Sequence, residues 1–413
     1  MSLMHRLKKE FSFVKGNYAV LIASWILIDF AAEIPTAYYA LYVLGLNATE
    51  TIVGTIGLFQ FLALASMQFP GGYLADKFGR KWIITIMTFG VALSYIFYVI
   101  APSWHFILIG AILMSLFNST YQPALMAMVA DSLPPEKRGM GFSIVTLIAS
   151  ASTTPGPVVA VLLRNTFGLM LGMRIGYGIV VVLFLVAALL RVLRLKETIK
   201  TTVKPKLTEF FRSYPVAMKE SFAVWRRLPR SLLFLFFALI ITQFGFATVM
   251  LYFPVYAVKE LLIDEAIWPL ITAAVPITTI LLAIPIGMTV DKVNRKIPIL
   301  ISYLLFGASM WIFVNGNVPL LVVSLMLVGA GMVMLNAGFG ALQADLTPRN
   351  ERGKVGGFTN FVGFIFMAIG NLVGGIMYEH FSPQLPFFIA AAVVLPSFLL
   401  TLALVHEPEK REE

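Results

Sequence analysis

Long apolar segments recur along this chain and limit what it can fold into. Each segment reaches or approaches the ~20 residues that a helix needs to cross the hydrocarbon core of a membrane. The segments are continuous, without the alternation of apolar and polar residues that a membrane β-barrel requires. We therefore expect an all-α membrane protein with twelve transmembrane helices. The expected helices lie near residues 18–44, 51–75, 82–103, 104–130, 140–163, 168–190, 231–258, 266–290, 297–315, 318–344, 355–378 and 384–405.

The composition agrees with a membrane protein and excludes several functional classes. Hydrophobic residues make up 59% of the 413 positions, and only 13% of residues are charged. There is no cysteine, which excludes a disulfide framework, a thiolate nucleophile and a cysteine metal site. The four histidines form no cluster, and the sequence shows neither a nucleophile with its base nor a His-Glu-x-x-His motif. We therefore expect no enzyme, no metal site and no resident cofactor.

The basic residues are distributed unevenly between the two sides of the membrane. With the N-terminus inside, twelve crossings place 28 of the 31 lysines and arginines in the cytoplasm, and leave Arg164, Arg174 and Lys259 towards the outside. This bias follows the positive-inside rule and predicts a multi-pass protein of the cell (inner, cytoplasmic) membrane with both termini in the cytoplasm. The net charge of +10 then suits anionic lipid head groups at the cytoplasmic loops, and nucleic-acid binding is not expected.

A long polar stretch divides the chain into two halves. We expect an N-terminal six-helix bundle over 1–194, a cytoplasmic linker over 195–230 and a C-terminal six-helix bundle over 231–413. Within the linker, aromatic and basic residues recur at helical spacing. This pattern suits either an amphipathic helix on the anionic inner leaflet or a solvated linker, and the sequence does not distinguish the two.

The two halves repeat each other at a nearly constant offset. The loops "GGYLADKFGRK" at 71–81 and "IGMTVDKVNRK" at 286–296 share five residues that lie 215 positions apart. The segments "ADSLPPEKRG" at 130–139 and "ADLTPRNERG" at 344–353 share Ala-Asp, a proline and Arg-Gly at an offset of 214. Such a repeat predicts two pseudo-symmetric bundles about an axis normal to the membrane, with a site between them near the midplane.

These residues resemble the major facilitator superfamily over nearly the whole chain. The loop at 71–81 is similar to that superfamily's signature between helices two and three, Gly-x-Leu-Ala-Asp-Arg-x-Gly-Arg-Lys, with Lys77 in place of the usual arginine. The resemblance implies the major facilitator fold, alternating access by two rocking bundles, and a central cavity lined mainly by helices one, four, seven and ten. It also implies a cytoplasmic gate in the charged loops. The expected gate residues are Gly72, Asp76, Arg80, Lys81, Asp131, Arg138, Asp291, Arg295, Asp345 and Arg352.

The charged loops allow two pairing schemes. Asp131 can pair with Arg80, or with Arg138 across its own loop, and the second half offers the same two alternatives. The competing interpretation is that the loops serve only to orient the protein in the membrane. Orientation explains the arginines but does not explain the matched aspartates, so we favour the gate.

Helix five carries a further signature. Gly156 and Pro157 resemble the core of the Gly-Pro-x-x-Gly-Gly motif of proton-coupled, multidrug-type exporters, and Pro157 is expected to kink the helix. Close packing of helices at a kink explains the same two residues equally well. A second signature of those exporters is an arginine within helix four, and residues 104–130 contain neither Arg nor Lys.

Two acidic residues lie within the first expected helix. Asp29 and Glu33 are four residues apart, so they project from nearly one face. The repeat places Gln243 and Ala247 at the corresponding positions of helix seven, so the fold itself does not require acids there. Acidic residues inside membrane helices usually mark ion or substrate paths. We interpret Asp29 and Glu33 as the proton-coupling pair, with the proton gradient as energy source; a structural role, such as an ion pair between Glu33 and Arg174, is the alternative.

The charges expected inside the membrane limit the substrate. No lysine or arginine is expected at mid-depth, so an anionic substrate would lack a counter-ion. We expect a monomeric secondary transporter whose partners are protons, membrane lipids and a cationic or neutral amphipathic small molecule, exported by proton-coupled antiport. The alternatives are proton-coupled symport or facilitated transport of a sugar or polyol, and transport of a lipid-like amphiphile. Expected substrate contacts are Trp25, Tyr38, Asn118, Tyr121, Gln122, Gln243, Phe244, Phe246, Tyr252 and Asn336.

Overall fold

Every regular element in the described part of the chain is helical. The computed structural model describes residues 13–68, 71, 74, 79–199, 215, 219, 228–290, 294–348 and 351–407. The first half contains α2 (Gly16–Glu33), η1 (Thr36–Tyr38), α3 (Tyr39–Gly45), α4 (Glu50–Met67), α6 (Arg80–Val99), α7 (Trp104–Asp131), η2 (Pro135–Lys137), α8 (Arg138–Thr153) and α9 (Gly156–Arg194). The second half contains α11 (Arg230–Met250), α12 (Phe253–Lys259), α13 (Trp268–Thr272), α14 (Ala274–Val290), α15 (Lys296–Val314), α16 (Val318–Leu346), α17 (Arg352–His380) and α18 (Leu385–Leu404). The expected linker, with its amphipathic segment, lies mostly outside the described residues.

The described helices supply the crossings expected of a multi-pass membrane protein. Among the described residues, eleven helical spans are long and apolar enough to cross a membrane. One of them, Met140–Arg194, has 55 residues and would reach about 80 Å as a single helix, more than twice the ~30 Å hydrocarbon core. Inside it Gly168 has a φ of 76° and a ψ of 168°, a conformation that glycine adopts readily and that breaks the helix. The all-α fold is confirmed, and the spans are consistent with twelve crossings.

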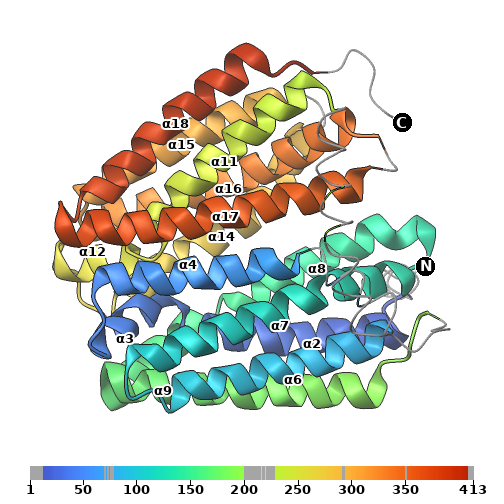
Figure 1. Cartoon of the computed structure of the whole chain (residues 1–413), viewed down its shortest axis with the longest axis horizontal. Coiled ribbons are helices and arrows are strands. Elements are labelled where there is room, and N and C mark those ends of the chain that lie inside the picture. The colour runs from blue at the N-terminus through green and yellow to red at the C-terminus, as the bar shows by residue number, and fades with distance from the viewer. Residues whose placement is uncertain are drawn as a thin grey trace, which may run out of the picture.

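The helices form two bundles, which Figure 1 shows one above the other. In the first bundle, α6 packs against α7 and α9, and α2 packs against α9. In the second bundle, α15 packs against α16 and α18, and α11 packs against α17 and α18. Between the bundles the most extensive contact is that of α4 with α17, and α8 also contacts α14. Helices far apart in the sequence therefore meet across an interface between the bundles.

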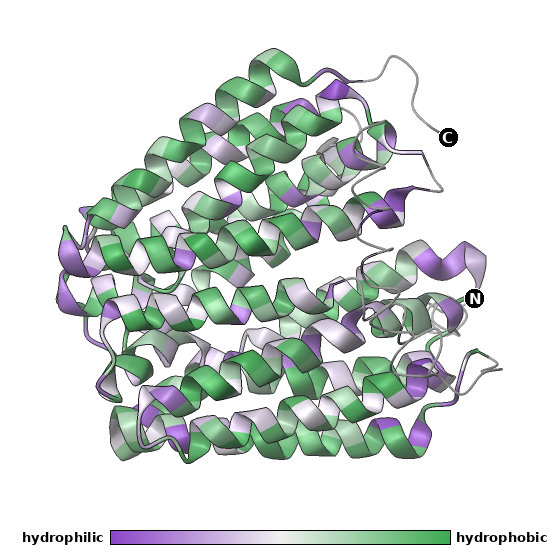
Figure 2. Ribbon diagram, in the orientation of Figure 1, coloured by the Kyte–Doolittle hydropathy of each residue, from purple (hydrophilic) through white to green (hydrophobic). Residues whose placement is uncertain are grey.

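The two ends of the molecule differ in how closely the bundles approach each other. Hydrophobic residues cover most of the length of the helices, and hydrophilic residues gather towards the two ends (Figure 2). We call the end at which α2 begins and α18 ends the terminal end, and the end with α3 and α12 the distal end (Figure 1). The ribbons of the two bundles run close together at the distal end and farther apart at the terminal end.

The first helix of each half is interrupted close to a proline. In the first half α2 ends at Glu33, and Pro35 precedes η1 and α3. In the second half α11 ends at Met250, and α12 carries Pro254 in its first turn. Proline lacks a backbone N–H and its ring clashes with the preceding turn, so a helix cannot run straight through it. The sequence therefore places the last turn of α2, with Glu33, beside the space between the bundles.

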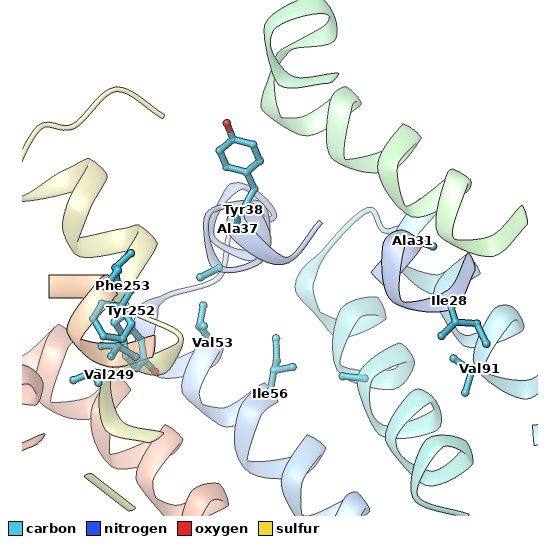
Figure 3. Close-up of a cluster of buried hydrophobic side chains, with 14 of the residues drawn as sticks. Ile28, Ala31, Ala37, Tyr38, Val53, Ile56, Val91, Val249, Tyr252 and Phe253 are labelled. Atoms are coloured by element: carbon cyan, nitrogen blue, oxygen red, sulfur yellow. The ribbon is translucent and has the colours of Figure 1, made fainter. Parts of the chain in front are cut away.

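Glycine residues let the two bundles approach each other at the distal end. A Cβ atom on Gly375 of α17 would lie 2.6 Å from the carbonyl oxygen of Glu50 and 2.6 Å from the hydroxyl of Tyr252. A Cβ atom on Gly54 of α4 would also lie 2.6 Å from the Tyr252 hydroxyl. Figure 3 shows Tyr252 beside the part of α4 that carries Val53. Because real Cβ atoms do not pack this closely, larger residues at these positions would hold the bundles apart.

Candidate functional site

A cavity of about 640 Å3 lies between the two bundles. Its volume is within the range of sites that hold drug-sized molecules. The four helices expected to line it, which correspond to α2–α3, α7, α11–α12 and α16, all contribute, and so do α4, α6, α8, α9, α13 and α14. Aromatic rings from both bundles form much of the wall: Tyr39, Phe61, Tyr95, Tyr98, Tyr177, Phe246, Phe253 and Trp268.

Glu33 is the one acidic or basic residue among the described residues that line this cavity. It is the last residue of α2, where the helix dipole disfavours a carboxylate, so helix stability does not explain it. Gly156, the first residue of α9, packs against it, because a Cβ atom on Gly156 would lie 2.8 Å from Cβ of Glu33. The helix is interrupted at Thr154 and Pro155, directly before the expected kink residues Gly156 and Pro157. The kink thus makes room for the acid.

Asp29 has surroundings different from those of Glu33. It lies one turn earlier on α2 and does not line the cavity. Its Oδ2 atom is buried and has no hydrogen-bond partner among the described residues. Arg191 of α9 is the basic residue whose charge opposes that of Asp29 most strongly. Of the two acids that the sequence paired, only Glu33 lines the central cavity.

Arg191 is a buried charge that the sequence did not reveal. The expected helix over 168–190 ends before Arg191, whereas α9 continues to Arg194 and the Arg191 side chain is fully buried. Its Nε atom donates to the hydroxyl of Ser24 at 2.9 Å, and its Nη1 atom donates to the hydroxyl of Thr88 at 2.6 Å. The buried positions of α9 continue at helical spacing through Phe184, Ala187 and Ala188 to Arg191, which is the signal that could have located it.

The expected aromatic substrate contacts are distributed over four environments. Phe246 lines the cavity. Tyr38 and Tyr252 are fully buried at the distal interface between the bundles. Tyr121 is also buried, and its ring lies 5.7 Å from the Arg191 guanidinium. The two remaining rings, Trp25 and Phe244, are partly buried and do not line the cavity.

The expected amide contacts do not come together at the cavity. Gln122 donates to Asn118 at 3.3 Å, one turn away on the same helix. Gln243 has a buried Oε1 atom without a partner among the described residues, and Asn336 is exposed. None of these four side chains lines the cavity, to which Gln60 contributes instead. Among the described residues, no group of His, Asp or Glu could hold a metal ion.

Two tyrosines at equivalent positions of the repeat make reciprocal contacts across the distal interface. The Tyr38 hydroxyl donates to the carbonyl oxygen of Glu265 at 2.7 Å. The Tyr252 hydroxyl donates to the carbonyl oxygen of Glu50 at 3.2 Å. Tyr38 and Tyr252 are 214 positions apart, and Glu50 and Glu265 are 215 positions apart. The sequence repeat therefore extends to a pair of symmetry-related hydrogen bonds that join the bundles.

Ion pairs reinforce the same interface. Lys259 Nζ lies 2.8 Å from Glu50 Oε1, and Arg164 Nη2 lies 3.1 Å from Glu265 Oε2. Each pair joins one bundle to the other, and the two acids are those whose carbonyl groups accept the tyrosine hydrogen bonds. Arg164 and Lys259 are two of the three basic residues that the positive-inside rule assigned to the outer side of the membrane. Their rarity on that side was the sequence feature that could have indicated a specific role. We call these two ion pairs and two hydrogen bonds the distal latch.

The distal latch predicts a modest effect of charge reversal. Lys259→Glu places a second negative charge beside Glu50 and should shift the molecule about two- to fivefold towards a distally open state, since exposed ion pairs contribute ~0.2–1 kcal/mol. Swapping the charges with Glu50→Lys/Lys259→Glu should restore the wild-type distribution. The measurement is the labelling rate of a cysteine introduced at Ala40, a buried cavity residue, in this naturally cysteine-free chain. Glu260→Lys alters distal charge outside the latch and serves as the control; an equal shift in it would contradict the latch.

At the terminal end, the described charge pairs remain within single bundles. Arg80 forms an ion pair with Asp131, and Arg295 forms the equivalent pair with Asp345. Of the two pairing schemes that the loops allowed, these contacts follow the first. Three of the expected gate residues lie outside the described part of the chain: Gly72, Asp76 and Asp291.

The other two expected gate arginines bind backbone carbonyl groups in matching ways. Arg138 donates to the carbonyl oxygen of Ala130 at 3.2 Å. Arg352 donates to the carbonyl oxygen of Ala344 at 2.8 Å. The two arginines are 214 positions apart in the sequence, and so are the two alanines. These arginines therefore hold the ends of their own loops.

Glutamates after the last helix of each half cap the helices that follow the signature loops. The Glu197 carboxylate accepts from the backbone N–H of Arg80 at 3.0 Å and from that of Lys81 at 3.1 Å. The Glu407 carboxylate accepts from the backbone N–H of Lys296 at 2.9 Å. A carboxylate at a helix N-terminus satisfies free N–H groups and favours the helix dipole. Both acids lie in the polar segments after the last apolar run of each half, and no sequence motif distinguishes them there.

Comparison with protein families gives a match along the chain. The family model described as Major Facilitator Superfamily matches residues 17–268 and 235–413. The two matched ranges together span both bundles. The two ranges overlap at residues 235–268, within the second half.

Curated relatives match a part of the chain. The quinolone resistance protein NorA of Staphylococcus aureus (strain Mu50 / ATCC 700699) is 30% identical over 181 residues, which are 43% of this chain and 45% of that protein. Multidrug resistance protein 1 of Bacillus subtilis (strain 168) is 34% identical over 142 residues, 34% of this chain and 36% of that protein. The alignments thus span less than half the length of the curated relatives they match.

Solved structures share the fold over nearly the whole chain. The nucleoside transporter NupG superposes with a TM-score of 0.75 at 16% identity, covering 94% of this chain and 99% of that one. A POT family transporter in complex with 5-aminolevulinic acid superposes with a TM-score of 0.72 at 14% identity, covering 93% and 94%. At these identities the likeness concerns the arrangement of the helices.

Proposed function

This chain belongs to the Major Facilitator Superfamily, and we propose that it is a secondary active transporter that exports a monovalent lipophilic cation in exchange for protons. As a member of this family with many apolar helices, it is a multi-pass membrane transporter rather than an enzyme. The observation that carries the finer proposal is the cavity between the bundles. It combines a mainly apolar wall, which includes eight aromatic rings, with Glu33 as the one acidic or basic residue described in its lining.

The chemistry of this lining favours a cation with an apolar body. A carboxylate supplies the counter-charge, and an aromatic face attracts a cation by an additional ~2 kcal/mol when water is excluded. The rings of Tyr98 and Tyr177 lie 4.7 Å apart, and Tyr95 packs against both, so the first bundle offers a continuous aromatic surface. A sugar or polyol would need several amides or carboxylates at the cavity, whereas the described lining offers mainly hydroxyl groups, Gln60 and Glu33.

Glu33 also supplies a simple route to exchange. A proton and a cation compete for the same carboxylate, so the site holds one or the other, but not both. Alternating access then carries the cation in one direction and the proton in the opposite one. The names of the partial relatives, a quinolone resistance protein and a multidrug resistance protein, support an exporter of drug-like compounds.

The proposal includes an orientation in the membrane. The positive-inside rule places the terminal end, with both termini, in the cytoplasm of a cell whose inner membrane holds the protein. The distal latch then closes the outer side, and the bundles diverge towards the cytoplasm, as expected of an inward-facing state (Figure 1).

Reconstitution in liposomes tests the proposed exchange. With ethidium, a monovalent aromatic cation, as probe, we expect its uptake to drive protons out of the vesicle and an imposed pH gradient to drive it against its concentration gradient. A quinolone, sorbitol and a short-chain phospholipid form the comparison arms, and protein-free liposomes are the control. If sorbitol drives proton movement and ethidium does not, the protein is a polyol transporter. If only the phospholipid drives it, the protein transports a lipid-like amphiphile.

Cysteine labelling tests the orientation. We expect a cysteine at Glu260, exposed at the distal end, to react with a membrane-impermeant maleimide in intact cells, and a cysteine at Glu136, exposed at the terminal end, to react only after lysis. The natural chain has no cysteine, so the background is zero. The reverse pattern would place the termini outside.

A further inference from the structure

Arg191 connects four helices of the first bundle from a fully buried position. It extends from α9, donates to Ser24 on α2 and to Thr88 on α6, and lies over the ring of Tyr121 on α7. These contacts use Nε and Nη1. The remaining nitrogen, Nη2, is buried and has no hydrogen-bond partner among the described residues. A buried guanidinium bound only to neutral hydroxyls lacks a counter-charge, which is costly.

Asp29 is the acid of α2 that could supply the missing counter-charge. It follows Ser24 by five residues, about 7.5 Å along the axis of α2, and it also acts electrostatically on Tyr121. Its Oδ2 atom is a buried acceptor without a partner, as Nη2 of Arg191 is a buried donor without one. The other titratable groups around the pair are Glu33, one turn further along α2, and the phenol of Tyr121.

We propose that Arg191 is the fixed charge partner of Asp29, and that this pairing leaves Glu33 as the single exchangeable charge of the transporter. The pair positions α2 against the rest of the first bundle, directly before the turn that carries Glu33. Asp29 is thereby withdrawn from exchange. This extension rests on the proposed cation–proton exchange, and it specifies one proton for each monovalent cation.

A stability cycle tests the pairing without reference to transport. Asp29→Asn and Arg191→Gln each leave one buried charge uncompensated, so each should lower the thermal unfolding midpoint of the purified protein by several degrees. The double variant Asp29→Asn/Arg191→Gln removes both charges and should recover most of that loss. Glu33→Gln combined with Arg191→Gln is the matched control, in which the two effects should add. If a single variant does not accumulate in the membrane, recovery of expression in the double variant serves as the same readout.

The proton-to-cation ratio tests the consequence for exchange. Ethidium-driven proton movement in liposomes should give a ratio of one for the wild type. In Arg191→Gln the released Asp29 becomes a second exchangeable acid and the ratio should rise towards two, whereas Arg191→Lys, which keeps the charge, and the double variant should return it to one. A purely structural arginine would alter stability and leave this ratio unchanged.

Two outcomes overturn the inference. One is an additive stability cycle between Asp29 and Arg191, and the other is an unchanged ratio in Arg191→Gln. A wild type that exchanges no protons would instead refute the proposed function, and the stability cycle would still decide whether the two residues are paired.

Discussion

Gly54→Ala/Gly375→Ala should prevent the distal end from closing and reduce transport at least tenfold. Both Cβ atoms would fall 2.6 Å from the Tyr252 hydroxyl, and that on Gly375 would also lie 2.6 Å from the carbonyl oxygen of Glu50. Overpacking of this kind costs ~1–3 kcal/mol, and in this interface the bundles can relieve it by separating. A penalty of that size changes the ratio of two conformations about 5- to 150-fold.

Accessibility measures this shift directly. In the double glycine variant, a cysteine at Ala40, buried in the wall of the cavity, should react faster with an impermeant maleimide supplied from the distal side. Gly178→Ala is the matched control, since a Cβ atom on Gly178 of α9 would meet nothing within 4 Å. Unchanged labelling and transport in Gly54→Ala/Gly375→Ala would show that the bundles do not need this close approach.

Glu33→Gln should abolish cation-driven proton movement and weaken cation binding about 10- to 150-fold. Hydrogen bonds to charged groups contribute ~1.5–3 kcal/mol, and each 1.4 kcal/mol corresponds to a tenfold change in affinity. In the wild type, lowering the pH adds a proton to the acid, removes the counter-charge and weakens binding of the cation. Glutamine cannot take up that proton, so the variant should bind the cation with little dependence on pH.

Equilibrium binding of ethidium between pH 5 and pH 9 checks this second expectation. Glu33→Asp keeps the carboxylate and should retain the pH dependence with reduced affinity. Glu136→Gln removes an acid from the exposed terminal-end surface and should match the wild type throughout. A Glu33→Gln protein whose ethidium affinity still falls at low pH would assign the titrating group to another residue.

Local features of the sequence carry most of the fold. The apolar segments predict the crossings because a helix in lipid must satisfy its own backbone hydrogen bonds. The offset of 214–215 residues predicts a chain of two similar halves, and it also relates contacts such as Tyr38–Glu265 and Tyr252–Glu50. The same offset did not show that these tyrosines join the bundles, since the pattern within each half does not identify a partner in the other half.

The surroundings of Asp29 and Glu33 could not be predicted from the sequence around them. A spacing of four residues correctly places Asp29 and Glu33 one turn apart on α2, and the cost of burying a carboxylate correctly marks them as unusual. Which acid meets the cavity depends on the break after Glu33 and on the position of Gly156 in another helix. Arg191, the counter-charge that we propose for Asp29, lies 162 positions away in the sequence.

By itself, the sequence determined that this is a membrane protein, that it is all-α and that it consists of two similar halves. It also identified Asp29 and Glu33 as acids whose burial in a membrane helix is costly. Only the tertiary structure decided that Glu33 lines the cavity, that Arg191 is buried against α2 and α6, and that Arg164 and Lys259 join the bundles at the distal end. The physical reason is that hydropathy and helical periodicity act over a few turns of one chain segment. Counter-charges and packing partners, in contrast, come from helices that meet only after the bundles have assembled.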